Sequence, residues 1–108
     1  MDLATECYRL AKLLPRSEEF RITSQLLRAA ASVPANIAEG WMRATRRDYA
    51  RFVSIARGSV AEVETFLLLS NRTGLLLEHE TVRAIELCDR LGRQLNVLWG
   101  QLSKSPNP

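Results

Sequence analysis

The sequence predicts an all-α fold, an antiparallel four-helix bundle in up-down-up-down order, and three observations lead to this prediction. Apolar residues recur with the helical period in four separate stretches, and no stretch alternates apolar and polar residues as a strand does. Residues that stop helices or form turns separate the four stretches, so the connections are short. Helices joined by short connections pack beside one another in alternating directions. A chain of 108 residues fits one domain with one core.

The first expected helix covers residues 2–13 and is amphipathic. One face carries, at spacings of four, three and four, Leu3, Cys7, Leu10 and Leu14. Pro15 ends this helix because proline cannot continue the backbone hydrogen-bond ladder. The second expected helix begins at Ser17, whose hydroxyl is a capping group, and the two acidic residues that follow suit the positive end of the helix dipole.

An unbroken apolar face runs through the second helix, which we expect to extend to about Arg43. This face consists of Ile22, Leu26, Ala30, Val33, Ile37 and Trp41. Pro34 lies within the stretch, and a proline inside a helix normally costs about 3 kcal/mol. Because the phase of the apolar residues is the same on both sides of Pro34, we predict a continuous helix there.

The third expected helix begins at Thr45, which has Asp48 three residues later as in a capping box, and runs to about Thr73. Gly58 lies within it, where glycine costs roughly 1 kcal/mol relative to alanine, and close approach of another helix would explain this residue. The four apolar residues at 66–69 point all round the helix. One core cannot use all of them, so we expect a subunit interface there.

The fourth expected helix covers residues 78–102 and follows Gly74, a fitting helix stop. Its apolar face consists of Ala84, Leu87, Cys88, Leu91, Leu95, Leu98, Trp99 and Leu102. The remaining segment, 103–108, is polar and contains two prolines, so we expect a disordered tail. The bundle itself is therefore assigned to residues 1–102.

Catalysis, metal binding and membrane insertion find little support in the sequence. His79 is the only histidine, no second ligand stands at metal-binding spacing, and there is no glycine-rich phosphate loop. Cys7 and Cys88 fall at apolar positions, so we expect buried thiols. The N-terminus lacks a signal sequence and no apolar run is long enough to span a bilayer, which makes the cytoplasm the expected location. We predict a non-enzymatic protein without a cofactor.

A polar stripe lies opposite the apolar face of the second helix. It includes Arg28, Ser32, Asn36 and Glu39, which are spaced to share one side of the helix. Two interpretations stay open: a face held by local hydrogen bonds and ion pairs, or a polar network between subunits.

A basic cluster surrounds the turn between the second and third helices. It consists of Arg43, Arg46, Arg47 and Arg51. Arg46 and Arg47 stand at a helix N-terminus, where the dipole disfavours positive charge by a few tenths of a kcal/mol. Residues that depart from such a local preference without a visible gain indicate function. On a chain with 13 arginines among 15 basic residues, however, a group of four arginines can also arise by chance. Because no aromatic residue is interleaved with them, we expect contacts to nucleic-acid phosphates rather than to bases.

Three segments of the sequence resemble the signature of bacterial four-helix-bundle proteins encoded in intervening sequences of large-subunit ribosomal RNA genes. The first runs from Ser24 to Gly40 and ends in Asn-Ile-Ala-Glu-Gly. The others are Arg43 with 48–52, and 55–59 followed by Glu62 and Glu64. The resemblance covers most of the chain, from about residue 8 to residue 77.

This resemblance implies a homo-oligomeric barrel, specifically a homopentamer. It also implies kinship with the accessory variability proteins of diversity-generating retroelements, which work with a reverse transcriptase and its RNA. The leading functional hypothesis is therefore a nucleic-acid-associated oligomer that binds RNA or DNA phosphates through its arginines. The alternative is a protein-interaction adaptor, an accessory subunit of a reverse transcriptase. A small-molecule-binding bundle is disfavoured because no polar group falls in the predicted core.

Overall fold

The computed structural model describes residues 1–104, and these contain four α-helices and no strand. The helices are α1 (Asp2–Ala11), α2 (Ser24–Trp41), α3 (Arg46–Arg72) and α4 (Glu78–Ser103). A 3₁₀ turn, η1 (Arg16–Glu18), and a π-helical turn, η2 (Glu19–Thr23), precede α2. The all-α prediction is confirmed. The molecule measures 49 × 22 × 18 Å, so its length is set by the three long helices.

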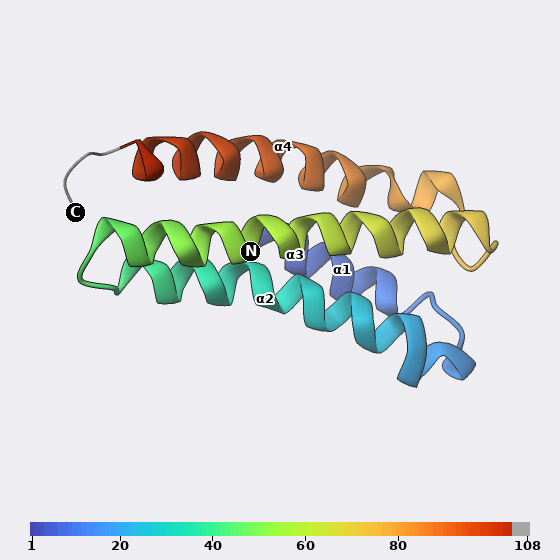
Figure 1. Ribbon diagram of the computed structural model, residues 1–108. Helices are drawn as coiled ribbons and strands as arrows, with labels where there is room; N and C mark the ends of the chain where they lie inside the picture. Colours follow the sequence, from blue (N-terminus) through green and yellow to red (C-terminus); the bar gives the residue numbers. More distant parts are fainter. Residues whose placement is uncertain (105–108) are drawn as a thin grey trace.

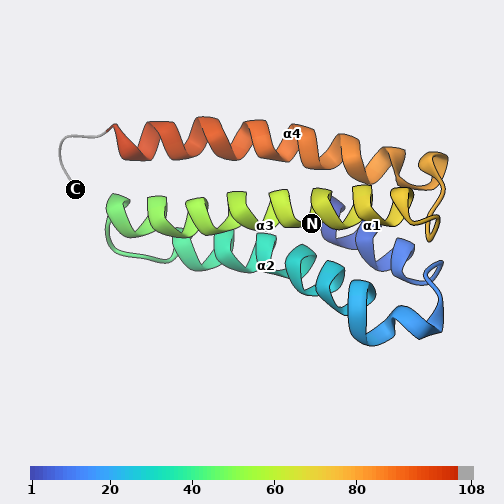
Figure 2. The same ribbon diagram turned by 45° about the vertical axis from the view of Figure 1, so that its right-hand side comes forward.

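The three long helices lie side by side, and α1 accompanies them along only part of their length (Figure 1). The connection between α2 and α3 lies at one end of the molecule, and the connection between α3 and α4 lies at the other. Helix α1 packs against α2 and α4 near the second of these ends, as Figure 2 also shows. We call the part that includes α1 the α1 half, and the part that includes the α2–α3 turn the turn half.

All four helices contribute apolar side chains to one core. The predicted apolar faces supply most of it, including Leu10, Leu26, Val53, Val63 and Ala84, which are fully buried. Trp41 was placed on the buried face of the second helix, and this prediction is wrong, since its side chain is 73% exposed. Gly40 is the buried residue at this end of α2, and one residue farther along a helix is a rotation of about 100° away from the core.

The glycines of α2 and α3 show where helices approach closely. The expected close approach at Gly58 is wrong, because a Cβ atom there would meet nothing within 4 Å. The close approach occurs instead at Gly40, where a Cβ would lie 2.8 Å from the Cβ of Phe52 and 3.0 Å from Cδ1 of Tyr49. A side chain at this position would force the end of α2 away from the start of α3.

The start of the second helix differs from the prediction. No side chain caps the helical turns at Ser17, and Arg21 has φ −114° and ψ −108°, so regular α-helix begins only at Ser24. Leu14 and Ile22, on either side of these turns, are both buried. The chain must bring both side chains into the core within a few residues. One straight helix that starts at Ser17 would not bury both of them. Farther on, α2 continues through Pro34, as predicted.

The ends of α3 follow the predicted local signals. The Thr45 hydroxyl accepts a hydrogen bond from the Asp48 backbone N–H at 3.1 Å, so the N-cap prediction is confirmed. Gly74 has φ +77°, the left-handed conformation that ends helices. Helix α4 includes Ser103, one residue more than expected, and residues 105–108 of the expected tail lie outside the described residues.

Both cysteines are buried free thiols, as predicted. Burial raises the pKa of Cys7 and of Cys88 to about 12, so both thiols are neutral at physiological pH. Within residues 1–104, no helix combines the length and the apolar character needed to cross a membrane.

Candidate nucleic-acid interface

The four arginines of the predicted basic cluster all have exposed side chains at the α2–α3 turn. Two of them meet on one aromatic ring, because the guanidinium carbons of Arg43 and Arg51 lie 4.8 Å and 4.6 Å from the centroid of Phe52. Arg43 follows α2 and Arg51 lies in α3, so the close approach at Gly40 is what brings them to the same ring. A guanidinium on an aromatic face is attracted by the ring quadrupole and keeps its N–H edges available.

Arg43 has a second partner within α2. Its Nη2 lies 2.7 Å from Oε1 of Glu39, four residues earlier, in an ion pair with both side chains largely exposed. The carboxylate and the ring together restrict the orientation of Arg43. The carboxylate also offsets part of its charge, so Arg43 offers an anion less than a free guanidinium would.

Arg46 has a structural role that its sequence position does not reveal. Its Nη2 donates a hydrogen bond to the backbone carbonyl of Gln101 at 3.2 Å, in the last turn of α4. A helix C-terminus has unsatisfied carbonyl groups and a negative dipole end, where a cation is favoured. The positive charge that is unfavourable at the start of α3 is therefore favourable at the end of α4, and this contact gives Arg46 a structural reason for its position.

Arg47 differs from its three neighbours in the cluster. Its side chain is exposed, and it makes no hydrogen bond or ion pair with any residue in the described part of the chain. Its position in the first turn of α3 is unfavourable for a positive charge. Among the four arginines, Arg47 is thus the one whose placement the internal contacts do not explain.

Aromatic residues accompany the arginines, contrary to the expectation that none is interleaved with them. Besides Phe52, the rings of Trp41 and Tyr49 meet edge to face, with centroids 5.9 Å apart and planes at 80°. The signal for this arrangement was present in the sequence. Tyr49 and Phe52 belong to the family-like segment 48–52, and Trp41 belongs to the apolar face expected for the second helix. In the structure Tyr49 packs against the core, whereas Trp41 is exposed.

The predicted polar stripe divides into separate contacts. The Asn36 amide donates to the carbonyl of Ser32 at 2.8 Å and to its hydroxyl at 2.9 Å, and the hydroxyls of Ser32 and Ser59 lie 2.8 Å apart. The bonds of Asn36 lie within α2, and the bond between Ser32 and Ser59 joins α2 to α3. Glu39 belongs instead to Arg43, and Arg28 is exposed without a polar contact in residues 1–104. Ser32 and Asn36 thus both make hydrogen bonds within the chain.

The sequence did not indicate the roles of two further residues, Ser59 at the contact between α2 and α3 and Arg57 at the contact between α3 and α4. Ser59 is buried, and its only signal was its place in the family-like segment 55–59. Arg57 donates to the amide oxygen of Asn96 at 2.7 Å, and its guanidinium carbon lies 4.6 Å from the centroid of Trp99. This pairing joins α3 to α4 across a separation of 39 residues, which no local pattern shows.

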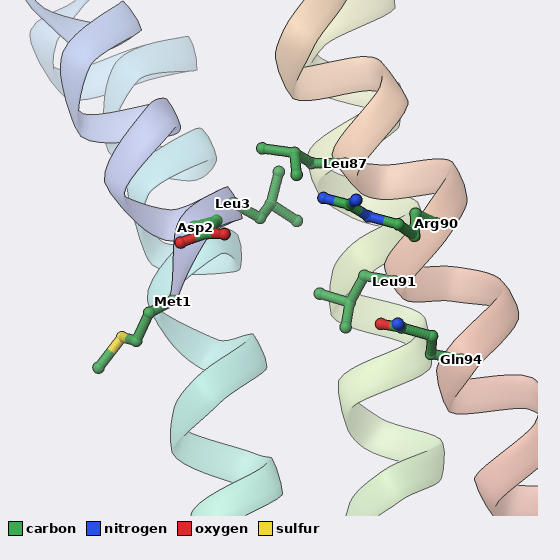
Figure 3. Close-up of a pocket in the computed structure, with 7 residues that line it drawn as sticks. All are labelled: Met1, Asp2, Leu3, Leu87, Arg90, Leu91 and Gln94. Carbon is green, nitrogen blue, oxygen red and sulfur yellow. The ribbon is translucent and has the colours of Figure 1, made fainter.

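A pocket of about 230 Å³ lies where α1 begins beside α4 (Figure 3). Its walls carry Met1, Asp2 and Leu3 on one side and Leu87, Arg90, Leu91 and Gln94 on the other. These residues do not include a nucleophile next to a general base. Among residues 1–104, no three His, Cys, Asp or Glu side chains are grouped to hold a metal ion, and His79 is exposed.

Comparisons with known proteins agree with the family-like segments. The model of the 23S rRNA-intervening sequence protein family matches residues 1–97. A crystal structure of a protein of unknown function from the S23 ribosomal protein family of Bacteroides thetaiotaomicron VPI-5482 superposes with a TM-score of 0.84 at 25% identity. That comparison covers 91% of this chain and 92% of the other. No curated protein matches the sequence. On the extent of the family match, the chain belongs to the 23S rRNA-intervening sequence protein family.

Proposed function

We propose that this protein is a non-enzymatic, nucleic-acid-associated protein that binds phosphates through arginines at the α2–α3 turn. The observation that carries the proposal is the concentration of exposed guanidinium groups at one turn, two of them held on the ring of Phe52. We call this surface the arginine–aromatic platform, and it consists of Trp41, Arg43, Arg47, Tyr49, Arg51 and Phe52.

The members of the platform contribute unequally. Arg47 and Arg51 have no carboxylate partner among residues 1–104, so both offer a full charge to a phosphate. Arg43 shares its charge with Glu39, and Arg46, beside the platform, gives one N–H to the end of α4. The net charge of +3 is small, so a localised group of arginines is a better explanation for binding than the overall field.

Assembly would strengthen such binding. We propose that the helices form an antiparallel up-down-up-down bundle and that bundles associate into a homo-oligomer, a pentamer if the chain follows the family resemblance. Leu68 and Leu69 are half exposed at the end of α3, which supports an apolar contact between copies. Each copy would add one platform, and several weak phosphate contacts on one nucleic acid act together.

An electrophoretic mobility shift across a salt series, on protein whose mass is known from light scattering, tests this proposal. Structured RNA and duplex DNA are the probes. We expect salt-sensitive binding that Arg47→Glu weakens severalfold, because phosphate contacts release counterions. Arg72→Glu is the matched control, since it changes the net charge equally at the far end of α3. Equal losses in the two variants, or binding that ignores salt, would contradict the proposal.

The second candidate function is a protein adaptor, with a reverse transcriptase or another encoded protein as the partner. The observation in its favour is the composition of the platform, since tryptophan, tyrosine and arginine are the residue types that dominate binding energy between proteins. Absence of binding to either probe by correctly assembled protein would favour this candidate.

A further inference from the structure

We propose that the arginine–aromatic platform is specific for single-stranded nucleic acid, with an unpaired base stacked on the indole of Trp41 and the adjacent phosphates held by the arginines. This inference rests on the proposed function and names its ligand. Three features of the platform carry it: the exposure of the indole, the rigidity of its support, and the charge around it.

The indole of Trp41 presents an open ring. The side chain is 73% exposed, and its contact with Tyr49 is perpendicular, so the two rings do not stack face to face. Met42 beside it is 79% exposed. Apolar surface left in water is unfavourable, and a base stacked on the ring would remove it from water. A site that binds phosphates alone would not use the indole of Trp41.

The support of Trp41 is rigid. Gly40 allows α2 to approach Tyr49 and Phe52 within van der Waals distance. The turn that follows is closed by backbone hydrogen bonds, from Met42 to the carbonyls of Ala38 and Glu39 and from Arg43 to that of Gly40. The backbone that carries the ring is held in this way, so little backbone freedom is lost on binding, which favours the ring as a stacking surface.

The charge around Trp41 selects the kind of nucleic acid. The guanidinium carbons of Arg43 and Arg51 lie 4.8 Å and 4.6 Å from the centroid of Phe52. Arg51 has no carboxylate partner among residues 1–104, so its N–H groups can donate to phosphate oxygens. A duplex offers phosphates but keeps its bases stacked inside, so Trp41 would gain nothing from it. A single strand offers both groups, and base stacking on aromatic side chains beside a basic surface is how proteins bind single strands without sequence preference.

Fluorescence anisotropy with a labelled oligouridine of about twelve nucleotides, and with an RNA duplex of equal length, tests the proposal. We expect Trp41→Ala to weaken oligouridine binding roughly 5- to 100-fold and to leave duplex binding unchanged. Trp41→Tyr should restore much of the loss. Phe20→Ala, which removes an 89% exposed ring in the α1 half, is the matched control and should have no effect. Oligothymidine replaces oligouridine in a parallel measurement to separate RNA from DNA.

A second readout comes from the fluorescence of Trp41 itself, observed in a Trp99→Phe background. Stacking should quench it on addition of oligouridine. Oligouridine binding that Arg47→Glu weakens but Trp41→Ala does not, without quenching, would overturn this inference and leave the proposed function standing. Absence of binding to any nucleic acid would overturn both and favour an acidic protein partner for the platform.

Discussion

The α1 half and the turn half use the same three long helices for different purposes. In the α1 half, a fourth helix closes a core of large aliphatic side chains that includes Leu10 and Leu67, both fully buried. In the turn half, α2 and α3 meet through a glycine and smaller residues, including Val53 and Ala56. Large leucines supply more stabilisation per residue than small ones, so we expect most of the stability to come from the α1 half.

The exposed apolar side chains of the two halves also differ. In the α1 half they include the leucines Leu13, Leu68 and Leu69 and the ring of Phe20. In the turn half Trp41 and Met42 lie among arginines. Exposed aliphatic patches favour contact with another protein surface, whereas aromatic rings among guanidinium groups favour anionic ligands with flat faces. From this comparison we expect that substitutions in the two halves would separate the proposed self-association from the proposed ligand binding.

The largest expected effect is the loss of stability in Leu10→Ala. This side chain is 0% exposed, and the cavity should lower the free energy of unfolding by about 2–5 kcal/mol. Urea denaturation at a fixed protein concentration measures it. Leu98→Ala, which truncates a partly buried leucine of α4 in the turn half, is the control and should lose less. Similar losses in both variants would break the distinction between the halves.

Gly40→Ala should have the next largest effect. The new Cβ would lie 2.8 Å from the Cβ of Phe52, so the helices must separate, at a cost of about 1–3 kcal/mol. Gly58→Ala is the control in the same pair of helices. It meets nothing within 4 Å and should raise stability by roughly 0.5–1 kcal/mol through helix propensity. Thermal unfolding distinguishes the two variants, and a stabilising Gly40→Ala would show that α2 and α3 do not approach this closely at the turn.

Ser59→Ala should have a smaller effect, at the middle of the α2–α3 contact. The substitution removes the hydroxyl that pairs with Ser32 at 2.8 Å, and we expect a loss of about 1 kcal/mol. Ser54→Ala removes an exposed hydroxyl from the same helix and should change stability little. If the two variants unfold at the same urea concentration, the hydrogen bond contributes nothing measurable.

The smallest expected effect is a pH dependence at Glu6 in the α1 half. A hydrogen bond from Arg9 holds the pKa of Glu6 below its ordinary value of 4.5. The unfolded chain therefore binds this proton more readily, so the stabilisation is complete above the ordinary value and is lost as pH falls through the lowered pKa. The stability difference between wild type and Glu6→Gln should be constant near neutral pH and should shrink as the pH falls below the ordinary value of 4.5. Arg9→Met should produce the same trend, and a constant difference would exclude this contribution.

Most of the helix boundaries could be predicted from the sequence because their causes are local. The cap at Thr45, the left-handed Gly74 and the helical spacing of buried leucines each depend on residues within a few positions. The second helix is the exception. Its beginning is set by the need to bury both Leu14 and Ile22, so Ser17, a good local start signal, does not begin a regular helix.

The candidate site could be located but not understood from the sequence. The arginine cluster was identified by residue type and position, and its place at an exposed turn is as predicted. The individual roles of these arginines could not be predicted. Arg46 is explained by a carbonyl 55 residues away, and Phe52 acts on the arginines because Gly40 brings α2 against α3. Sequence spacing carries no information about such distant contacts.

By itself, the sequence determined an all-α chain with four helices, two buried thiols and arginines gathered at one turn, since periodicity, caps and residue type act over short distances. Only the tertiary structure decided which arginines retain unshared charge and where the aromatic rings point. Helix α1 lies beside the long helices along only part of their length and does not reach the α2–α3 turn. Packing between helices decides which side chains of the turn half are buried, paired or exposed. This packing depends on pairs of residues that are far apart in the sequence.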